Sequence, residues 1–163
     1  MDGIYISGGL NMITDKQMKA LVELTQQKAT RDKYRGRTTW VRRWLFLHLL
    51  IGAKLSVKDI TQLRICDVHL NCSVNYIKSF KGTQIIIDSA LASHIREYIQ
   101  IKQVRGEPVD SHDYLLTPSV DGRPYTRMSI YKLYHGTLKN AGIQRMKFND
   151  FLMSITEVQR LSD

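Results

Sequence analysis

The sequence predicts a mainly α-helical domain with a small antiparallel β-sheet at one edge, an α+β fold. The first observation is the order of the apolar patterns: three helical segments precede three short strand-like segments, and three further helical segments follow them. The second is the length of 163 residues with 43% hydrophobic residues, which suffices for one ordinary domain with a core. Residues 1–12 carry three glycines and no apolar period, so we expect a flexible leader there and a single domain over residues 13–163.

The first two helices are predicted from capping residues and apolar faces. Thr14 and Gln17 have the spacing of a capping box, so the first helix is expected to begin at Thr14. Residues 28–37 are polar, basic and interrupted by glycine, and we expect a loop or a frayed helix end there. A second helix begins at about Thr38 with a broad apolar stripe, and Gly52 is expected to close it.

The remaining elements follow from a second capping box and from alternating apolar patterns. Ser56 and Asp59 have capping-box spacing and start the third helix. Strands are expected at 68–70, 74–78 and 83–87, and helices at 89–104, at 126–141 and from about 147. Lys81-Gly82 marks the tight turn between the last two strands.

The charge balance is strongly basic. The formal net charge is +9 and the sequence pI is near 9.7, which favours a polyanionic partner such as DNA, RNA or an anionic membrane face. A dense basic run covers residues 28–43, in which Asp32 is the one acidic residue and Trp40 is among the interleaved aromatic residues. This run is interpreted either as a phosphate-binding strip or as a solvated loop followed by a helix start.

Neither a metal site nor a cofactor is expected from the sequence. Cys66 and Cys72 are not accompanied by a histidine or cysteine cluster, so free thiols in a reducing compartment are the simplest interpretation. The N-terminus lacks the pattern of a signal peptide, and the apolar stretch at 44–53 is too short to span a bilayer. We therefore expect a cytoplasmic protein without a membrane segment.

The order of these elements resembles the catalytic domain of tyrosine recombinases, the phage integrase family. Four stretches carry the resemblance: 49–68, 74–87, 89–101 and, as the best match, 113–143. Each motif is weak alone, but their order and spacing together are fairly specific, and they cover about residues 12–150. The resemblance covers the catalytic domain, and we expect no counterpart of the family's N-terminal core-binding domain in this sequence.

In that family a tyrosine attacks a DNA phosphodiester, two arginines and a histidine or tryptophan stabilise the charge, and a lysine protonates the leaving oxygen. The resemblance places Ser56 in the first arginine position, or Lys54 if the alignment shifts by two residues. Without the resemblance, Ser56 is interpreted as an ordinary helix N-cap. Lys78 falls in the lysine position, with Lys81 as the runner-up.

The histidine and second arginine positions are held by Met146 and Asn149, so the resemblance implies that these positions are vacated. No tyrosine follows Tyr134 before the sequence ends at Asp163. We therefore expect a protein that binds double-stranded DNA but does not cut it by itself. Two alternatives remain: a fragment of an active recombinase whose nucleophile lies elsewhere, and a module that regulates an active recombinase or self-associates.

The candidate DNA-binding residues share a positive charge and form two groups. They are Lys28, Arg31, Lys33, Arg35, Arg37, Arg42 and Arg43 in the basic run, and Lys81, Arg123, Arg127 and Lys132 on the hairpin and around the start of the fifth helix. Arg127 lies in the first turn of that helix, where backbone N–H groups also favour phosphate. Contacts of this kind position a protein on the DNA backbone and carry no sequence information directly.

Overall fold

The computed structural model describes residues 12–71 and 73–162. In chain order it contains α1 (Asp15–Tyr34), α2 (Thr39–Ala53), α3 (Val57–Gln62), a 3₁₀ turn (Ile65–Asp67), β1 (Val68–His69), β2 (Tyr76–Lys78), β3 (Gln84–Ile86), α4 (Ser89–Val104), α5 (Arg127–Asn140) and α6 (Phe148–Ser162). The predicted mainly helical fold with a small antiparallel sheet is confirmed. The leader expected at residues 1–12 lies outside the described residues, apart from Met12.

Helix α1 begins at the predicted capping box and is longer than predicted. Thr14 and Gln17 exchange the two capping hydrogen bonds. Of the two alternatives expected over residues 28–37, the loop is wrong up to Tyr34, where these residues form the end of α1, and the chain leaves the helix at Arg35. Lysine, alanine and arginine favour helix, and buried Asp32 joins this end to α2 by accepting a hydrogen bond from the backbone N–H of Trp40 across 2.9 Å.

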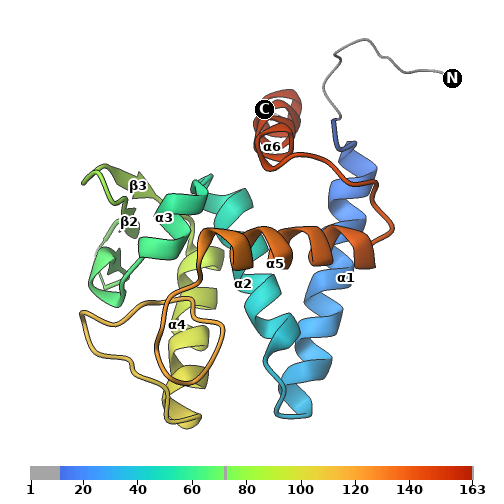
Figure 1. Cartoon of the computed structure of the whole chain (residues 1–163). Helices are drawn as coiled ribbons and strands as arrows, with labels where there is room; N and C mark the ends of the chain where they lie inside the picture. The colour runs from blue at the N-terminus through green and yellow to red at the C-terminus, as the bar shows by residue number, and fades with distance from the viewer. Residues whose placement is uncertain (1–11, 72, 163) are drawn as a thin grey trace, which may run out of the picture.

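Helix α2 is the centre of the domain. Figure 1 shows α1 along one side of it, α4 along the other and α5 crossing in front. The expectation that Gly52 closes α2 is wrong: the helix ends at Ala53, and its C-cap Lys54 adopts the left-handed conformation with a φ of 52°. Gly52 instead permits close packing of α4, because a Cβ built there would lie 2.9 Å from Cδ2 of Leu91.

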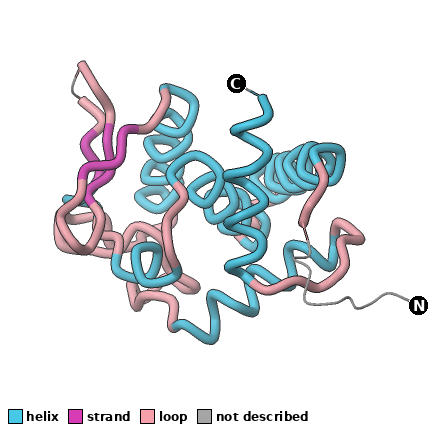
Figure 2. The backbone as a smooth tube through the Cα atoms, turned by 90° about the horizontal axis from the view of Figure 1, so that it is seen from above, coloured by secondary structure: helices cyan, strands magenta, loops and turns pink. Residues whose placement is uncertain are grey.

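The sheet is small, antiparallel and ordered β1-β2-β3. Ile77 is fully buried at its centre and pairs with Val68 on one side and Ile85 on the other. The strands are shorter than the predicted segments, and a tight turn with Gly82 at a φ of 86° joins β2 to β3 as expected. Figure 2 shows the sheet at one edge of the helical body.

Buried Tyr134 holds the start of α6 against α5. Its hydroxyl donates a hydrogen bond to the carbonyl oxygen of Met146 across 2.9 Å, and its ring packs edge-on against Phe148 and Phe151. About one turn further along α6, the helix meets the start of the described chain, where the backbone N–H of Ile13 donates to Oγ of Ser154 across 3.0 Å. In the described ranges, no helix is long and apolar enough to cross a membrane.

Candidate nucleic-acid interface

The first turns of α3, α5 and α6 meet at one groove of about 350 Å³, which we call the three-helix groove. Its lining consists of Ser56, Val57, Lys58 and Thr61 from α3, Arg127 and Tyr131 from α5, and Phe148, Asn149 and Leu152 from α6. Backbone N–H groups at a helix start carry partial positive charge, so the starts of the longer helices α5 and α6 at this groove favour an anion there.

The charged side chains that line the three-helix groove are both basic. Lys58 is exposed in the first turn of α3, and Arg127 is exposed at the first residue of α5. The Arg127 guanidinium lies 5.7 Å from the ring centroid of Tyr131, and its Nη2 is 3.5 Å from the tyrosine hydroxyl. Tyr131 in turn packs edge-on against Phe148. These contacts hold a guanidinium at the groove without an acidic partner in the lining.

Ser56 acts as the N-cap of α3, which confirms that interpretation of the sequence. Its hydroxyl donates to Oδ2 of Asp59 across 2.9 Å and accepts from the backbone N–H of Asp59 across 3.1 Å. Oδ1 of Asp59 accepts from the backbone N–H of Phe80 across 3.3 Å. The one carboxylate beside this wall of the groove is therefore engaged with the protein.

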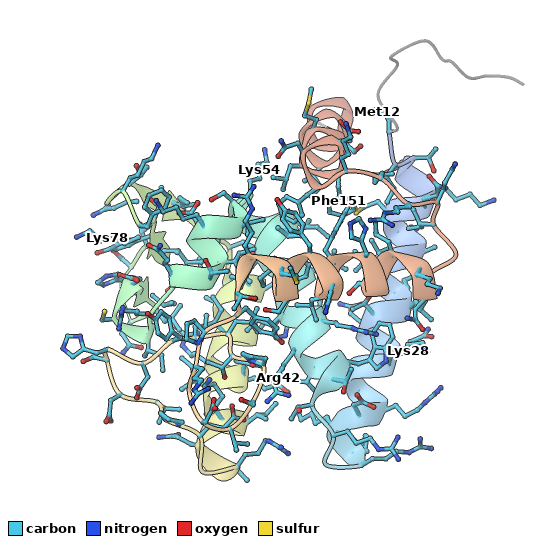
Figure 3. The ribbon with its side chains drawn as sticks, in the orientation of Figure 1. Met12, Lys28, Arg42, Lys54, Lys78 and Phe151 are labelled. Atoms are coloured by element: carbon cyan, nitrogen blue, oxygen red, sulfur yellow. The ribbon has the colours of Figure 1, made fainter. Side chains whose placement is uncertain are left out.

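The tip of the β2–β3 hairpin packs against α3 through Phe80. The ammonium groups of Lys58 and Lys81 lie 4.5 Å and 5.7 Å from the centroid of the Phe80 ring. Lys78 is exposed at the end of β2 and does not line the groove. In Figure 3, Lys78 lies on the sheet side of α3, whereas Lys54 lies between the start of α3 and α6. The hairpin therefore adds basic side chains beside the groove.

The structure brings together some of the predicted catalytic positions. Ser56 and Asn149 line the same groove, and exposed Lys54 lies two residues before Ser56 at the end of α2. Met146 is 6% exposed and lies in the core, so its side chain does not face the groove. Lys78, at the end of β2, is not among the residues that line the groove.

The sequence model of the Phage integrase family matches residues 11–154. The chain belongs to this family. No curated protein matches the sequence. Among solved structures, XerA recombinase is 18% identical with a TM-score of 0.67, and the match covers 93% of this chain and 52% of that chain. These values show the tyrosine recombinase catalytic-domain fold.

Two further similar structures are complexes of the XerH site-specific recombinase. The pre-cleavage complex with the difH substrate is 16% identical with a TM-score of 0.62, and the match covers 93% of this chain and 44% of that chain. The post-cleavage complex with a palindromic difH substrate is also 16% identical, with a TM-score of 0.62 and coverages of 90% and 40%. The integrase-family chain thus spans about half or less of the recombinases it resembles.

Arg42 was expected among the DNA-binding residues of this integrase-family chain, but its side chain is turned inward. The residue is 9% exposed and its guanidinium contacts the hydroxyl of Thr38. Nη2 of Arg42 lies 3.7 Å from Oε2 of buried Glu107. Because that carboxylate draws the guanidinium into the interior, Arg42 does not add charge to an exposed basic strip.

The rest of the basic run lies away from the three-helix groove. Residues 31–37 occupy the end of α1 and the turn into α2, whereas the groove begins just after the opposite end of α2. A helix of 15 residues is roughly 22 Å long, so α2 separates the two regions by about that distance. Lys28 and Arg43 lie over the Trp40 ring at 4.9 Å and 4.5 Å, and partial burial lowers the pKa of Arg43.

The other predicted basic residues are exposed. Nε of Arg123 lies 3.5 Å from Oδ2 of Asp121 in the loop before α5, and Lys132 lies on the surface of α5. Sequence reasoning missed Lys58 and Tyr131 as groove residues. Their positions carry a usable signal, since Lys58 is in the first turn that Ser56 caps and Tyr131 lies one helical turn after Arg127. Among the described residues, no group of three or more His, Cys, Asp or Glu side chains is arranged to hold a metal ion.

Proposed function

We propose that this integrase-family chain binds double-stranded DNA by holding a backbone phosphate in the three-helix groove, and that it does not cleave the strand by itself. The observation that carries the proposal is the meeting of Lys58 and Arg127 with the starts of α5 and α6 at a groove whose lining includes no acidic side chain. A phosphate there accepts charge-assisted hydrogen bonds from the guanidinium and from backbone N–H groups.

The neighbouring hairpin extends this basic surface beyond one phosphate. Lys78 and Lys81 are exposed, and the Phe80 contacts hold the hairpin tip against α3 beside the groove. Each phosphate that the surface neutralises releases counterions from the duplex, so DNA affinity falls as salt increases. The similar XerH structures are described as complexes with the difH substrate, which supports DNA as the ligand class.

The proposed lack of cleavage rests on the groove positions rather than on the extent of the chain. Ser56 and Asn149 present neutral side chains where the resemblance places two arginines, and Met146 is buried where it places a histidine. Removing a single transition-state donor of this kind costs roughly 10²–10³-fold in rate. Arg127 supplies one guanidinium from a different helix, which suits phosphate binding.

A salt titration of DNA binding tests the first part of the proposal. Fluorescence anisotropy with a labelled duplex of about 30 base pairs gives the affinity at several salt concentrations. We expect Arg127→Gln and Lys58→Gln each to weaken binding and to reduce the salt slope by about one. Lys139→Gln is the matched control, because Lys139 is exposed in the last turn of α5 and does not line the groove. No binding at low salt, or an equal loss in the control, would contradict the proposal.

A suicide DNA substrate tests the second part. Such a duplex traps the covalent protein–DNA intermediate of a tyrosine nucleophile, which is then separated by denaturing electrophoresis. We expect the chain to give no covalent adduct under conditions in which anisotropy shows the duplex to be bound. An adduct would instead establish a strand-cleaving recombinase and would disprove the proposed inactivity while leaving DNA binding intact.

A further inference from the structure

A second, larger groove lies between α1 and α4, with α2 as its floor. Two adjoining cavities of about 810 Å³ and 290 Å³ form it, and both are lined by Lys33, Val41, Glu97 and Ile101. We call it the α1–α4 groove. Figure 1 shows α1 and α4 on the two sides of α2, while α5 crosses α2 in front.

One wall of the α1–α4 groove is a continuous face of α4, a geometry suited to binding another helix. His94, Tyr98, Ile101 and Val104 line it at spacings of three or four residues, so one face of α4 forms a wall. These positions span about 15 Å along α4, or roughly three helical turns. An amphipathic helix of that length places its apolar face into such a groove.

Apolar side chains are exposed at the mouth of this groove. Tyr34 is 90% exposed at the end of α1, and Val104 is 89% exposed at the end of α4. Buried Ala29 and Val41 lie below them as an apolar floor, continued by the partly buried ring of Trp44. An apolar floor with exposed apolar residues at its rim is typical of an interaction site for another polypeptide.

The charge of the groove's rim favours an acidic partner. Lys33, Arg37 and Arg105 line the groove, against Glu97 as the acidic lining residue. Lys33 pairs with Glu97 across the groove from α1 to α4. Nε of Arg105 lies 3.4 Å from Glu107, but two other cations share that carboxylate. The rim therefore keeps an excess of positive charge.

We infer that the α1–α4 groove binds an acidic amphipathic helix of a partner protein. A second copy of this chain is disfavoured because its own net charge is +9. Duplex DNA complements the basic rim but leaves the apolar floor uncovered. The groove lies at the opposite end of α2 from the three-helix groove, so the partner and DNA bind at the same time. This inference does not depend on DNA binding.

A synthetic helix tests the inference directly. The probe is a fluorescein-labelled peptide of about 14 residues, with leucine on one face and glutamate on the other; its matched control carries lysine in place of glutamate. We expect the glutamate peptide to bind at least about tenfold more tightly than the lysine peptide. Equal binding of the two peptides, or no binding of the glutamate peptide, overturns the inference.

Variants of exposed groove residues locate the bound peptide. Val104→Asp places a carboxylate at the apolar rim and should weaken the glutamate peptide about tenfold, whereas Met128→Asp is the matched control at an exposed apolar residue of α5. Arg37→Glu should also weaken binding. Glu97→Gln frees Lys33 for the peptide and should strengthen binding a few-fold. An equal loss in the Met128→Asp variant overturns the assignment to this groove.

Two further measurements distinguish a partner helix from the two other possible occupants of the groove, duplex DNA and a second copy of this chain. Unlabelled duplex DNA should not displace the peptide, and Val104→Asp should leave duplex affinity unchanged; displacement by duplex would make the groove part of a DNA surface. Sedimentation velocity should show no dimer that forms through this groove, that is, no dimer that is present in the unaltered chain and absent in the Val104→Asp variant. A dimer with that property would identify a second copy as the occupant and would overturn the inference.

Discussion

The backbone N–H of Phe80 donates a hydrogen bond to Oδ1 of Asp59 across 3.3 Å, while Oδ2 of the same carboxylate accepts hydrogen bonds from Ser56. One side chain thereby joins the hairpin tip to the first turn of α3. Since Ser56 and Lys58 line the three-helix groove, the position of the hairpin relative to that groove depends on Asp59.

Asp59→Ala should loosen the hairpin as well as destabilise the domain. The substitution removes the Asp59 half of the capping box of α3 and the acceptor for Phe80, while the Ser56 hydroxyl still caps the helix, so we expect the free energy of unfolding to fall by about 1–2 kcal/mol. Urea unfolding measures that loss, and hydrogen exchange should become faster at the amides of residues 79–83. Ser56→Ala is the matched control, because it weakens the cap but keeps the Asp59–Phe80 bond. Equally fast hairpin exchange in both variants would contradict the role of that bond.

Asn149→Arg should strengthen duplex binding. Asn149 is exposed in the first turn of α6 and lines the three-helix groove, so an arginine there adds a fork of donors for phosphate. We expect affinity to rise about fivefold at roughly 0.1 M salt and the salt slope to increase by about one. Asn140→Arg, at the exposed end of α5, is the control with the same added charge. A gain that is equal in both variants would indicate a general charge effect and would not support the groove.

The elements that the sequence predicted well are fixed by neighbours along the chain. Thr14 with Gln17, and Ser56 with Asp59, form their capping boxes within one turn, and Gly82 permits the hairpin turn through its own backbone. Such signals need no tertiary information. The family resemblance assigned Ser56 and Asn149 to two arginine positions, and both line the three-helix groove, a relation that no local pattern predicts.

The wrong predictions depended on contacts between distant residues. The polar sequence of residues 28–34 is typical of a loop, but these residues form the end of α1. Asp32 is buried there because its carboxylate accepts a hydrogen bond from the backbone N–H of Trp40. In the sequence, Arg42 belongs to a basic run. Its side chain is buried because it pairs with Glu107, which follows α4 in the chain and lies far from Arg42 in the sequence. The position of the basic run relative to the three-helix groove also depends on tertiary structure, because the length of α2 separates the two.

Glu107→Gln should destabilise the domain strongly. The Glu107 side chain is 2% exposed and lies 3.7 Å from both Arg42 and Lys102, and 3.4 Å from Arg105. Removing its charge leaves buried cations without a partner, so we expect a loss of about 3 kcal/mol in the free energy of unfolding at pH 7. Urea unfolding measures it.

Two further variants show whether uncompensated charge causes that loss. Asp121→Asn removes the partner of Arg123 in an exposed pair and should lower the free energy of unfolding far less than Glu107→Gln does. Lys102→Met in the Glu107→Gln background removes one stranded cation and should restore part of the stability. Burial lowers the pKa of Lys102, which agrees with a strained ammonium group. A double variant no more stable than Glu107→Gln would show that lost packing, not charge, is responsible.

The paired rings of His48 and His94 should make the domain less stable in mild acid. Their Nδ1 atoms lie 2.8 Å apart and both rings stack on Trp44. Burial and, to a smaller extent, the charge of His48 lower the pKa of His94 to about 4, although the charge of Glu97 acts to raise it. Burial also lowers the pKa of His48. A lowered histidine pKa means that the unfolded chain binds the proton more readily. The stabilising contribution is therefore complete above pH 6.5 and is lost as the pH falls toward 4.

His94→Gln should flatten this dependence while retaining a polar side chain for His48. Between pH 7 and pH 5 we expect the unaltered chain to lose about 2 kcal/mol more unfolding free energy than the His94→Gln variant. Urea unfolding across this range measures the difference, and His112→Gln is the control because His112 is exposed away from the ring cluster. Identical pH profiles for the unaltered chain and the His94→Gln variant would show that His94 binds a proton equally well in the folded and the unfolded state. That result would contradict the prediction, because the contact of its Nδ1 with His48 disfavours a proton in the folded state.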